Sequence, residues 1–310
     1  MNNSPLRVAV VGVGHLGRHH ARVLASLPGV RLVGVVDTNT SRAAEVAQAN
    51  GTTVVASIQD LPGAVDAVIV AVPTEAHAAV AIPLLEAGID VLVEKPLTRS
   101  LSEADALIAA AARSGRVLGV GHIEHFNPAV QAARPHIHDP RFIEVHRLGT
   151  FPERSLDIDV VFDLMIHDIG LVLELVGSEV VGIEAVGVPV LTPRVDIANA
   201  RLKFANGCIA NLTASRISRD QVRKIRFFQK NTYLSIDYKA QEVEAWRLVP
   251  QETGMPRIDG GKLDVVRDEP LKRELADFVA AVRERRSPAV TGTHARAALV
   301  LANEIMTRMG

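Results

Sequence analysis

The chain has 310 residues, 48% hydrophobic and 22% charged, which is typical of a folded globular protein with one large domain or two ordinary ones. The net charge of -1 excludes the basic excess of proteins that bind nucleic acids or anionic membranes, and the single cysteine, Cys208, excludes an internal disulfide framework. No apolar run approaches the roughly 20 residues that span a bilayer. With no signal-peptide pattern at the N-terminus, we expect a cytoplasmic protein with no nucleic-acid or membrane partner.

Short Val-rich runs, each bounded by turn residues, alternate with Ala-rich helical patterns in the first part of the chain. The strand-like runs are residues 7–14, 31–37, 64–73, 89–96 and 116–122, and the helical patterns are residues 17–28, 40–51, 75–88 and 100–115. Apolar runs without strict alternation suit parallel strands that are covered on both faces. Residues 1–123 are therefore predicted to form an α/β domain with a doubly wound parallel sheet.

The pattern changes after residue 123 to longer strands, several of which alternate apolar and polar residues. These strands are residues 142–151, 180–191, 199–216, 224–238 and 241–250, with helices expected at 160–177, 271–285 and 293–309. The pair Asn206-Gly207 separates two apolar runs and predicts a hairpin. Residues 124–310 are predicted to form an α+β domain with an open, mostly antiparallel sheet, whose last helix can pack back on the first domain.

The first strand–helix junction contains the pattern Gly12-x-Gly14-x-x-Gly17, which predicts a dinucleotide site. The helix N-terminus offers free N–H groups to phosphates. Asp37 ends the second strand, where a carboxylate accepts hydrogen bonds from the adenosine ribose and repels a 2′-phosphate, so NAD is favoured over NADP. The alternative is that Asp37 only caps the next helix. The residues expected to bind the cofactor in this region are Gly12, Gly14, His15, Leu16, Gly17, Asp37 and Arg42.

Two charged residues, Glu94 and Lys95, directly follow the apolar strand at 89–93, and Pro96 comes next. Charges at the end of a buried strand are unfavourable without partners, so they indicate either a solvated strand end or a site. In a parallel sheet, ligands bind beyond the carboxyl ends of the strands. Pro73 and Thr74 follow the preceding strand, and we expect these residues to face the cofactor together with Glu94 and Lys95.

Residues 71–107 resemble the Gfo/Idh/MocA family of NAD(P)-dependent sugar and polyol dehydrogenases, most specifically through Glu94-Lys95-Pro96. The similarity extends from the glycines to Asp163-x-x-x-His167 and to a closing segment at 270–292. It implies a Rossmann domain followed by a domain whose open sheet forms an oligomer interface, and hence a homodimer or homotetramer.

The resemblance also assigns roles to single residues. It implies that Glu94 contacts the nicotinamide ribose and that the Lys95–Pro96 bond is cis. Lys95 is expected beside the reacting carbon of the substrate, where it can act on the hydroxyl proton. His77 and His122 are added to the expected cofactor contacts, and His122 is expected near the nicotinamide or the substrate.

Asp163 and His167 are four residues apart, so they lie on one face of the predicted helix. One Asp–His pair lacks the third ligand of a catalytic zinc, and no metal is expected. The resemblance implies instead that this motif lines the substrate. A pair of Lys95 and His167, oriented by Asp163, removes the hydroxyl proton and stabilises the oxyanion, and either member can be the base. Asp168 is expected to be a helix surface group.

Residues 121–133 resemble the branch of the family that oxidises carbon 3 of UDP-amino sugars such as UDP-N-acetylglucosamine, with His125 in place of an expected arginine. Histidine is a weaker anion contact than arginine. Glu124 and Asn127 are expected to bind sugar hydroxyls or the acetamido group, although Asn127 can instead cap a helix. The candidates for diphosphate contacts are Arg154, Arg216, Arg219 and Arg223.

These observations predict an NAD-dependent dehydrogenase that converts a UDP-amino sugar to its 3-keto form. An inositol or free-sugar dehydrogenase uses the same site and is the nearest alternative. A non-catalytic NAD-binding regulator is an alternative of another class, and Lys95, Asp163 and His167 argue against it. A further alternative is an enzyme that keeps NAD bound and recycles it between two substrates.

Overall fold

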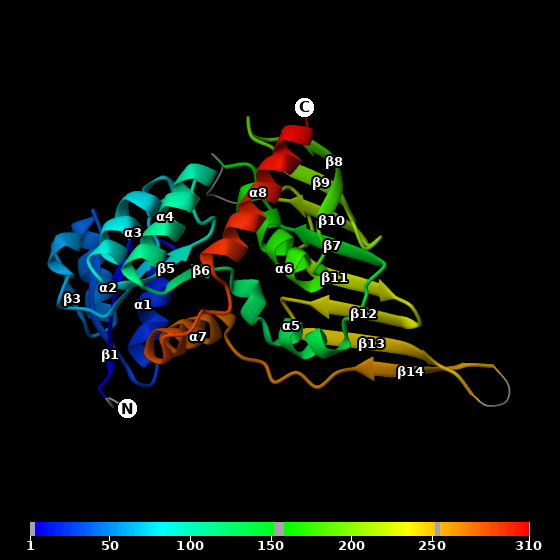
Figure 1. The fold of residues 1–310 in the computed structure, drawn as a ribbon, viewed down its shortest axis with the longest axis horizontal. Helices are drawn as coiled ribbons and strands as arrows, with labels where there is room; N and C mark the ends of the chain where they lie inside the picture. The colour runs from blue at the N-terminus through cyan, green and yellow to red at the C-terminus, as the bar shows by residue number, and fades with distance from the viewer. Residues whose placement is uncertain (1–3, 152–157, 252–254, 310) are drawn as a thin grey trace. The chain divides into compact units, whose positions relative to one another are not determined.

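The computed structural model describes residues 4–151, 158–251 and 255–309 (Figure 1). It divides into two compact units, one formed by Met1–Ile123 with Glu269–Ala297 and the other by Glu124–Asp268 with Ala298–Gly310. The change of unit after Ile123 coincides with the boundary expected from the sequence. The second unit is not contiguous, however, because helix α7 (Pro270–Glu284) and the start of α8 (Gly292–Arg308) belong to the first unit.

The first unit contains a six-stranded sheet in which every neighbouring pair is parallel. Its order is β3-β2-β1-β4-β5-β6, the arrangement of a Rossmann fold, which confirms the predicted doubly wound sheet. The strands are β1 (Leu6–Val11), β2 (Val30–Val36), β3 (Thr53–Val54), β4 (Ala67–Val70), β5 (Asp90–Glu94) and β6 (Leu118–Gly121). The helices between them are α1 (Gly17–Ser26), α2 (Thr40–Ala49), α3 (His77–Glu86) and α4 (Leu101–Ser114).

Burial explains why this sheet lacks alternation. Every residue of β4, β5 and β6 is buried, as expected for strands covered on both faces. Helix α7 joins this core because its inward face is apolar, with Leu275, Phe278, Val279 and Val282 buried against residues of β1, β2 and α1. Packing of that face accounts for the return of the chain to the first unit.

The second unit contains an eight-stranded sheet in the order β14-β13-β12-β11-β7-β10-β9-β8. Only β7 and β10 run parallel, which confirms the mostly antiparallel sheet. The strands are β7 (Phe142–Leu148), β8 (Val180–Val188), β9 (Ile197–Phe204), β10 (Ile209–Ser215), β11 (Val222–Gln229), β12 (Thr232–Asp237), β13 (Glu242–Val249) and β14 (Arg257–Lys262). The predicted hairpin at Asn206-Gly207 joins β9 to β10, and Gly207 has a φ of 85°.

One face of this sheet is covered and the other is open. Helices α5 (Pro128–Ala133) and α6 (Ile166–Val176) lie over the covered face, where alternate strand residues such as Ile143 and Val145 are buried (Figure 1). Large apolar side chains remain exposed on the opposite face. They are Val186, Val188, Phe228, Trp246, Leu248 and Ile258.

The helix predicted over residues 160–177 begins with a π-helical turn, Val161–Met165, and continues as α6 until Gly177, whose φ is 59°. Asp163 lies in the π turn and His167 lies on α6. The α-helical spacing assumed from the sequence therefore does not hold across this pair. Such π turns occur frequently at functional sites.

Candidate functional site

The glycine loop follows β1 and is shaped by close backbone contacts. A Cβ atom on Gly12, whose φ is 83°, would lie 2.7 Å from the carbonyl oxygen of Ala71, and one on Gly17 would lie 1.8 Å from the carbonyl oxygen of Gly12. Neither position accommodates a side chain. No side chain therefore covers the loop backbone at Gly12 and Gly17, near the start of α1, and a pyrophosphate can approach it closely. His15 and Leu16 lie exposed in this loop.

Asp37 links the end of β2 to the glycine loop. One carboxylate oxygen accepts the N–H of Val13 and the other accepts the N–H of Asn39, both at 2.8 Å. The side chain that caps α2 is Asn39, which accepts the N–H of Arg42 at 3.0 Å. Asp37 is thus not the helix cap, and its carboxylate lies at the carboxyl edge of the sheet.

A cavity of about 310 Å³ lies between this loop and α2. The residues that line it are Val13, Gly14, His15, Arg18, Arg42, Glu45 and Val46. The guanidinium of Arg42 is 4.0 Å from the carboxylate of Asp37. Three of the expected cofactor residues of this region, Gly14, His15 and Arg42, therefore line the cavity. Arg18 and Glu45 also line it, and the sequence did not single them out.

The Lys95–Pro96 peptide bond is cis, as the resemblance implied. His77 holds the backbone around it: Nδ1 lies 3.0 Å from the carbonyl oxygen of Pro96, and Nε2 lies 3.0 Å from that of Val72. His77 is buried, and burial lowers the pKa of its imidazole. This side chain therefore joins the turns that follow β4 and β5, and its ring nitrogens are directed at the protein backbone.

Glu94 is buried at the end of β5 and is hydrogen-bonded through both carboxylate oxygens. Oε1 lies 2.7 Å from Nε2 of His20 on α1, and Oε2 accepts the N–H of Lys95 at 3.0 Å. Burial alone raises the pKa of Glu94, but the hydrogen bond and charge of His20 and the charge of Lys95 outweigh it, so the pKa is lowered. A carboxylate is therefore maintained at the strand end.

His20 is a residue that the sequence interpretation missed. It is fully buried one turn into α1, next to the buried residues Ala21, Val23 and Leu24. The sequence feature that could have identified His20 is its position: it is a polar residue on the apolar face of the helix that follows the glycine loop, three positions after Gly17.

Most of the expected cofactor residues lie at the carboxyl edge of the first sheet, because they follow the ends of its parallel strands. Pro73 is exposed and Thr74 is half-buried in the turn after β4, Lys95 is half-buried after β5, and His122 is buried directly after β6. Asp163 and His167 are both half-buried within the second unit.

Asp168 was expected on the helix surface, and this expectation was wrong. Asp168 is 1% exposed and forms a bidentate ion pair with Arg147 of β7, with N–O distances of 2.6 and 2.9 Å. The third nitrogen of Arg147 donates to Glu124 at 2.9 Å. Burial raises the pKa of Asp168, while the charges of Asp168 and Glu124 outweigh burial at Arg147 and raise its pKa well above the usual value.

The polar side chains of residues 124–127 are bonded within the second unit. Asn127 accepts the N–H of Ala129 at 3.0 Å and so caps α5, and its amide donates to Glu124 at 3.2 Å. Nδ1 of His125 lies 2.6 Å from the carboxylate of Glu174. The helix-cap alternative for Asn127 is therefore observed, and the polar groups of this stretch support the scaffold.

Of the four candidate diphosphate ligands, Arg216 is buried and holds the segment before β9. Its Nε lies 3.1 Å from Asp196, and its guanidinium donates to the carbonyl oxygen of Val195 at 2.9 Å. Arg219 and Arg223 are exposed. Arg154 lies outside the described residues.

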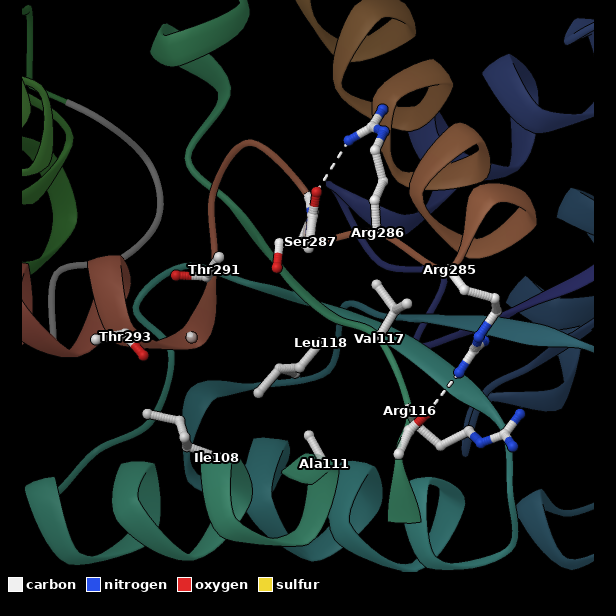
Figure 2. A pocket seen from close by; sticks show the side chains of 13 residues that line it. Ile108, Ala111, Arg116, Val117, Leu118, Arg285, Arg286, Ser287, Thr291 and Thr293 are labelled. Atoms are coloured by element: carbon white, nitrogen blue, oxygen red, sulfur yellow. Dashed lines mark hydrogen bonds between the residues drawn. The ribbon is translucent and has the colours of Figure 1, made fainter. Parts of the chain in front are cut away.

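A larger cavity, of about 540 Å³, lies at the amino end of β6, away from the strand ends that carry the expected site (Figure 2). Figure 2 shows Arg285 directed toward the backbone beside Arg116, and Arg286 toward Ser287. Arg285 is bonded to Asp90 and to the carbonyl oxygen of Gly115, and Arg286 to Asp277. These arginines are thus committed to protein partners.

Within residues 4–151, 158–251 and 255–309, no three His, Cys, Asp or Glu side chains are grouped so that they could hold a metal ion. In the same part of the chain, no helix has both the length and the apolar character needed to cross a membrane.

Comparisons with known proteins agree with this architecture. A family model described as "Oxidoreductase family, NAD-binding Rossmann fold" matches residues 6–122, and the GFO/IDH/MocA C-terminal domain matches residues 125–233. The chain is 40% identical over 302 residues to a UDP-N-acetylglucosamine 3-dehydrogenase of Acidithiobacillus ferrooxidans, with 97% of this chain and 96% of the relative covered. It is 31% identical over 233 residues to a scyllo-inositol 2-dehydrogenase (NAD(+)) of Bacillus subtilis, covering 69% and 68%.

Solved structures give the same result. A structure of the Acidithiobacillus ferrooxidans UDP-N-acetylglucosamine 3-dehydrogenase superposes with a TM-score of 0.92 at 39% identity, covering 98% of this chain and 97% of that one. A levoglucosan dehydrogenase in complex with NADH and levoglucosan has a TM-score of 0.87 at 20% identity, covering 99% and 97%, and shows the shared fold alone.

Proposed function

Because the chain belongs to the Gfo/Idh/MocA family of oxidoreductases, we propose that it oxidises carbon 3 of a UDP-amino sugar such as UDP-N-acetylglucosamine, with NAD⁺ as the hydride acceptor. The observation that carries this proposal is the 40% identity to a UDP-N-acetylglucosamine 3-dehydrogenase over nearly the whole of both chains. The inositol dehydrogenase alternative has weaker support, since 31% identity extends over 69% of the chain.

The choice of NAD over NADP is supported by Asp37. Its carboxylate is held beside the glycine loop by the N–H groups of Val13 and Asn39. Negative charge at this position repels a 2′-phosphate and accepts hydrogen bonds from ribose hydroxyls. The bare backbone around Gly12 and Gly17 fits the pyrophosphate, and bound NAD⁺ would supply the hydride acceptor.

We assign the proton chemistry to Lys95 and His167, with Asp163 orienting the histidine. Removal of a hydride from a carbinol carbon requires that the hydroxyl proton leaves as well, so a base must contact that hydroxyl. Glu94 holds the nicotinamide ribose in this proposal, because His20 keeps it as a carboxylate acceptor. A cation at Lys95 stabilises the oxyanion that forms as the proton leaves.

Glu124 and Asn127 are assigned an indirect role. Their polar atoms are bonded to Arg147, to the backbone of α5 and to each other, so we infer that they shape the substrate domain through its scaffold. Arg219 and Arg223 are exposed and remain the proposed contacts of the diphosphate.

A homodimer or homotetramer formed through the open face of the second sheet completes the proposal. That face exposes Phe228 and Trp246, and the ring of Phe228 makes tilted contacts with Phe142 and Tyr233 at centroid distances of 5.5 and 5.3 Å. Exposed aromatic groups on a sheet face are typical of protein interfaces.

The proposed function is tested by mixing the purified protein and NAD⁺ with UDP-N-acetylglucosamine, its uronic-acid analogue, myo-inositol and glucose, while NADH absorbance and 3-keto product are followed. Turnover of UDP-N-acetylglucosamine that is lost in Lys95→Ala and His167→Ala supports it. Turnover of inositol or glucose alone assigns the chain to the polyol branch. NAD⁺ binding without turnover points to a regulator, and co-purifying NAD points to a recycled cofactor.

A further inference from the structure

Glu274 is a buried carboxyl group to which the proposed chemistry gives no role. It is 2% exposed on the inward face of α7, beside Leu275 and one turn before Phe278. Among the described residues, neither carboxyl oxygen of Glu274 has a hydrogen-bond partner. A buried polar group in this state is unfavourable for folding and calls for an explanation.

Two contacts define the direction of α7, one at its C-terminal end and one in its middle. Arg285, which follows the helix, binds Asp90 at the start of β5, with a shortest N–O distance of 2.8 Å. Phe278, in the middle of the helix, packs on Gly119 of β6, where an added Cβ would lie 3.2 Å from its ring. The helix therefore runs antiparallel to the strands, and its N-terminal half lies toward their carboxyl ends.

This direction places Glu274 beside the Glu94 carboxyl group. Four helical residues back from Phe278 correspond to about 6 Å, and two strand residues forward from Gly119 to Gly121 correspond to about 6.6 Å. A Cβ on Gly121 would lie 3.1 Å from Oε2 of Glu94. The electrostatic influence of Glu94 on Glu274 agrees with this placement.

Glu94 on β5 thus links two buried groups into one cluster: it is bonded to His20 of α1 and acts electrostatically on Glu274 of α7. His20 keeps Glu94 ionised, so a second carboxylate in the cluster is strongly unfavourable. Burial first, and then the charges of Glu94 and Asp277, raise the pKa of Glu274 well above its usual value. Both effects favour the protonated, neutral form of Glu274.

We propose that Glu274 is a positioning residue that links cofactor charge to protonation: it holds a proton beside Glu94 in the free protein and releases it when the oxidised cofactor binds. The inference rests on the proposed placement of the nicotinamide ribose at Glu94. The positive nicotinamide favours a second negative charge in the cluster, so the O–H bond of Glu274 breaks and the proton passes to the solvent. With the neutral reduced nicotinamide the proton stays on Glu274, and no electrons are exchanged in this step.

The sign of the pH dependence follows directly. Because binding of NAD⁺ releases a proton, its affinity rises with pH, by at most about tenfold per pH unit, and the affinity for NADH does not. Other ionisable groups on the elements around Glu274 determine the pH range over which the NAD⁺ affinity changes. They are His20 on α1, Glu94 and Lys95 at the end of β5, His122 after β6, and Asp277 on α7.

The proton count is measured by titration calorimetry of NAD⁺ and NADH binding in buffers of different ionisation enthalpy, over a series of pH values. Wild type is expected to release up to one proton with NAD⁺ and none with NADH. Glu274→Gln keeps the shape of the side chain and cannot ionise, so the release is lost and NAD⁺ affinity becomes independent of pH in that range. The matched control is Glu284→Gln, an exposed glutamate on the same helix, which is expected to release protons as wild type does.

The inference is overturned if Glu274→Gln releases as many protons as wild type, or if wild type releases equal numbers with NAD⁺ and NADH. The second comparison needs no variant and so does not depend on the folding of Glu274→Gln. Glu94→Gln separates this inference from the proposed function. If NAD⁺ binds Glu94→Gln as tightly as wild type, the placement of the ribose at Glu94 is wrong. If NAD⁺ binds Glu94→Gln more weakly but Glu274→Gln still releases as many protons as wild type, the ribose placement stands and only the role of Glu274 is wrong.

Discussion

Replacing Arg147 by methionine is expected to destabilise the second unit strongly. The Arg147 side chain is 5% exposed and neutralises two buried carboxylates, Asp168 and Glu124, through three N–O contacts between 2.6 and 2.9 Å. Removing one partner of a buried ion pair costs about 3–5 kcal/mol, because the remaining charge has no compensation. At roughly 2–4 °C per kcal/mol, the melting temperature falls by about 6–20 °C.

The measurement is thermal unfolding at pH 7, with Arg247→Met as the matched control. Arg247 pairs with Asp259 at 2.9 Å on the surface of the same unit, and its side chain is 68% exposed. An exposed pair contributes about 0–1 kcal/mol, so the control is expected to change the melting temperature by only a few degrees. Equal losses in the two variants would refute the claim that burial determines the effect.

The pH dependence of Arg147→Met provides a second check. Burial already raises the pKa of Asp168 in the wild type, and removal of Arg147 raises it further. A group whose pKa is raised on folding contributes stability below its unfolded pKa and loses it as the pH rises through its folded pKa. The deficit of Arg147→Met is therefore expected to shrink as the pH falls from 7 to 5. A deficit that is constant over this range contradicts the role assigned to Asp168.

Three further predictions concern separate parts of the molecule. Asp37→Asn removes the charge that repels a 2′-phosphate, so the NAD/NADP ratio of kcat/KM is expected to fall about tenfold, which corresponds to about 1.4 kcal/mol. Burial raises the pKa of Glu174, but His125 and Arg134 outweigh it and lower the pKa to about 2. The contribution of Glu174 to stability is therefore present above pH ~4.3 and is lost as the pH falls toward 2. Glu174→Gln is expected to remove this loss of stability from the acid-unfolding curve. Trp246→Arg places a charge on the open sheet face and is expected to lower the mass measured by light scattering; an unchanged mass argues against that interface.

Features that depend on neighbouring residues were predictable from the sequence. The parallel sheet was predicted from Val-rich runs that alternate with helical segments, and the β9–β10 hairpin from Asn206-Gly207. The strand ends that bear Asp37, Glu94 and Lys95 also follow, because consecutive parallel strands present their carboxyl ends at one edge. In each case the determining information lies within a single strand, turn or strand–helix unit.

Features that depend on distant partners were not predictable. Asp168 is adjacent to His167 in sequence, and nothing in that segment indicates that Asp168 is buried. Its burial depends on the ion pair with Arg147 of β7, which is 21 residues away along the chain. His20 is 74 residues from its partner Glu94. The π turn at Val161–Met165 adds no signal to the apolar pattern, because it changes the hydrogen bonds and not the residue types.

The contrast between Glu94 and Glu124 bears on how specificity is encoded. Both are buried glutamates in segments that resemble the family, and both are hydrogen-bonded through each carboxylate oxygen. Glu94 ends a parallel strand, at the edge where ligands bind, whereas Glu124 is bonded to a guanidinium that also holds Asp168 within the scaffold. Substitution of Glu124 therefore acts first on the stability of the second unit, and a loss of activity in such a variant demonstrates substrate contact only if its melting temperature is unchanged.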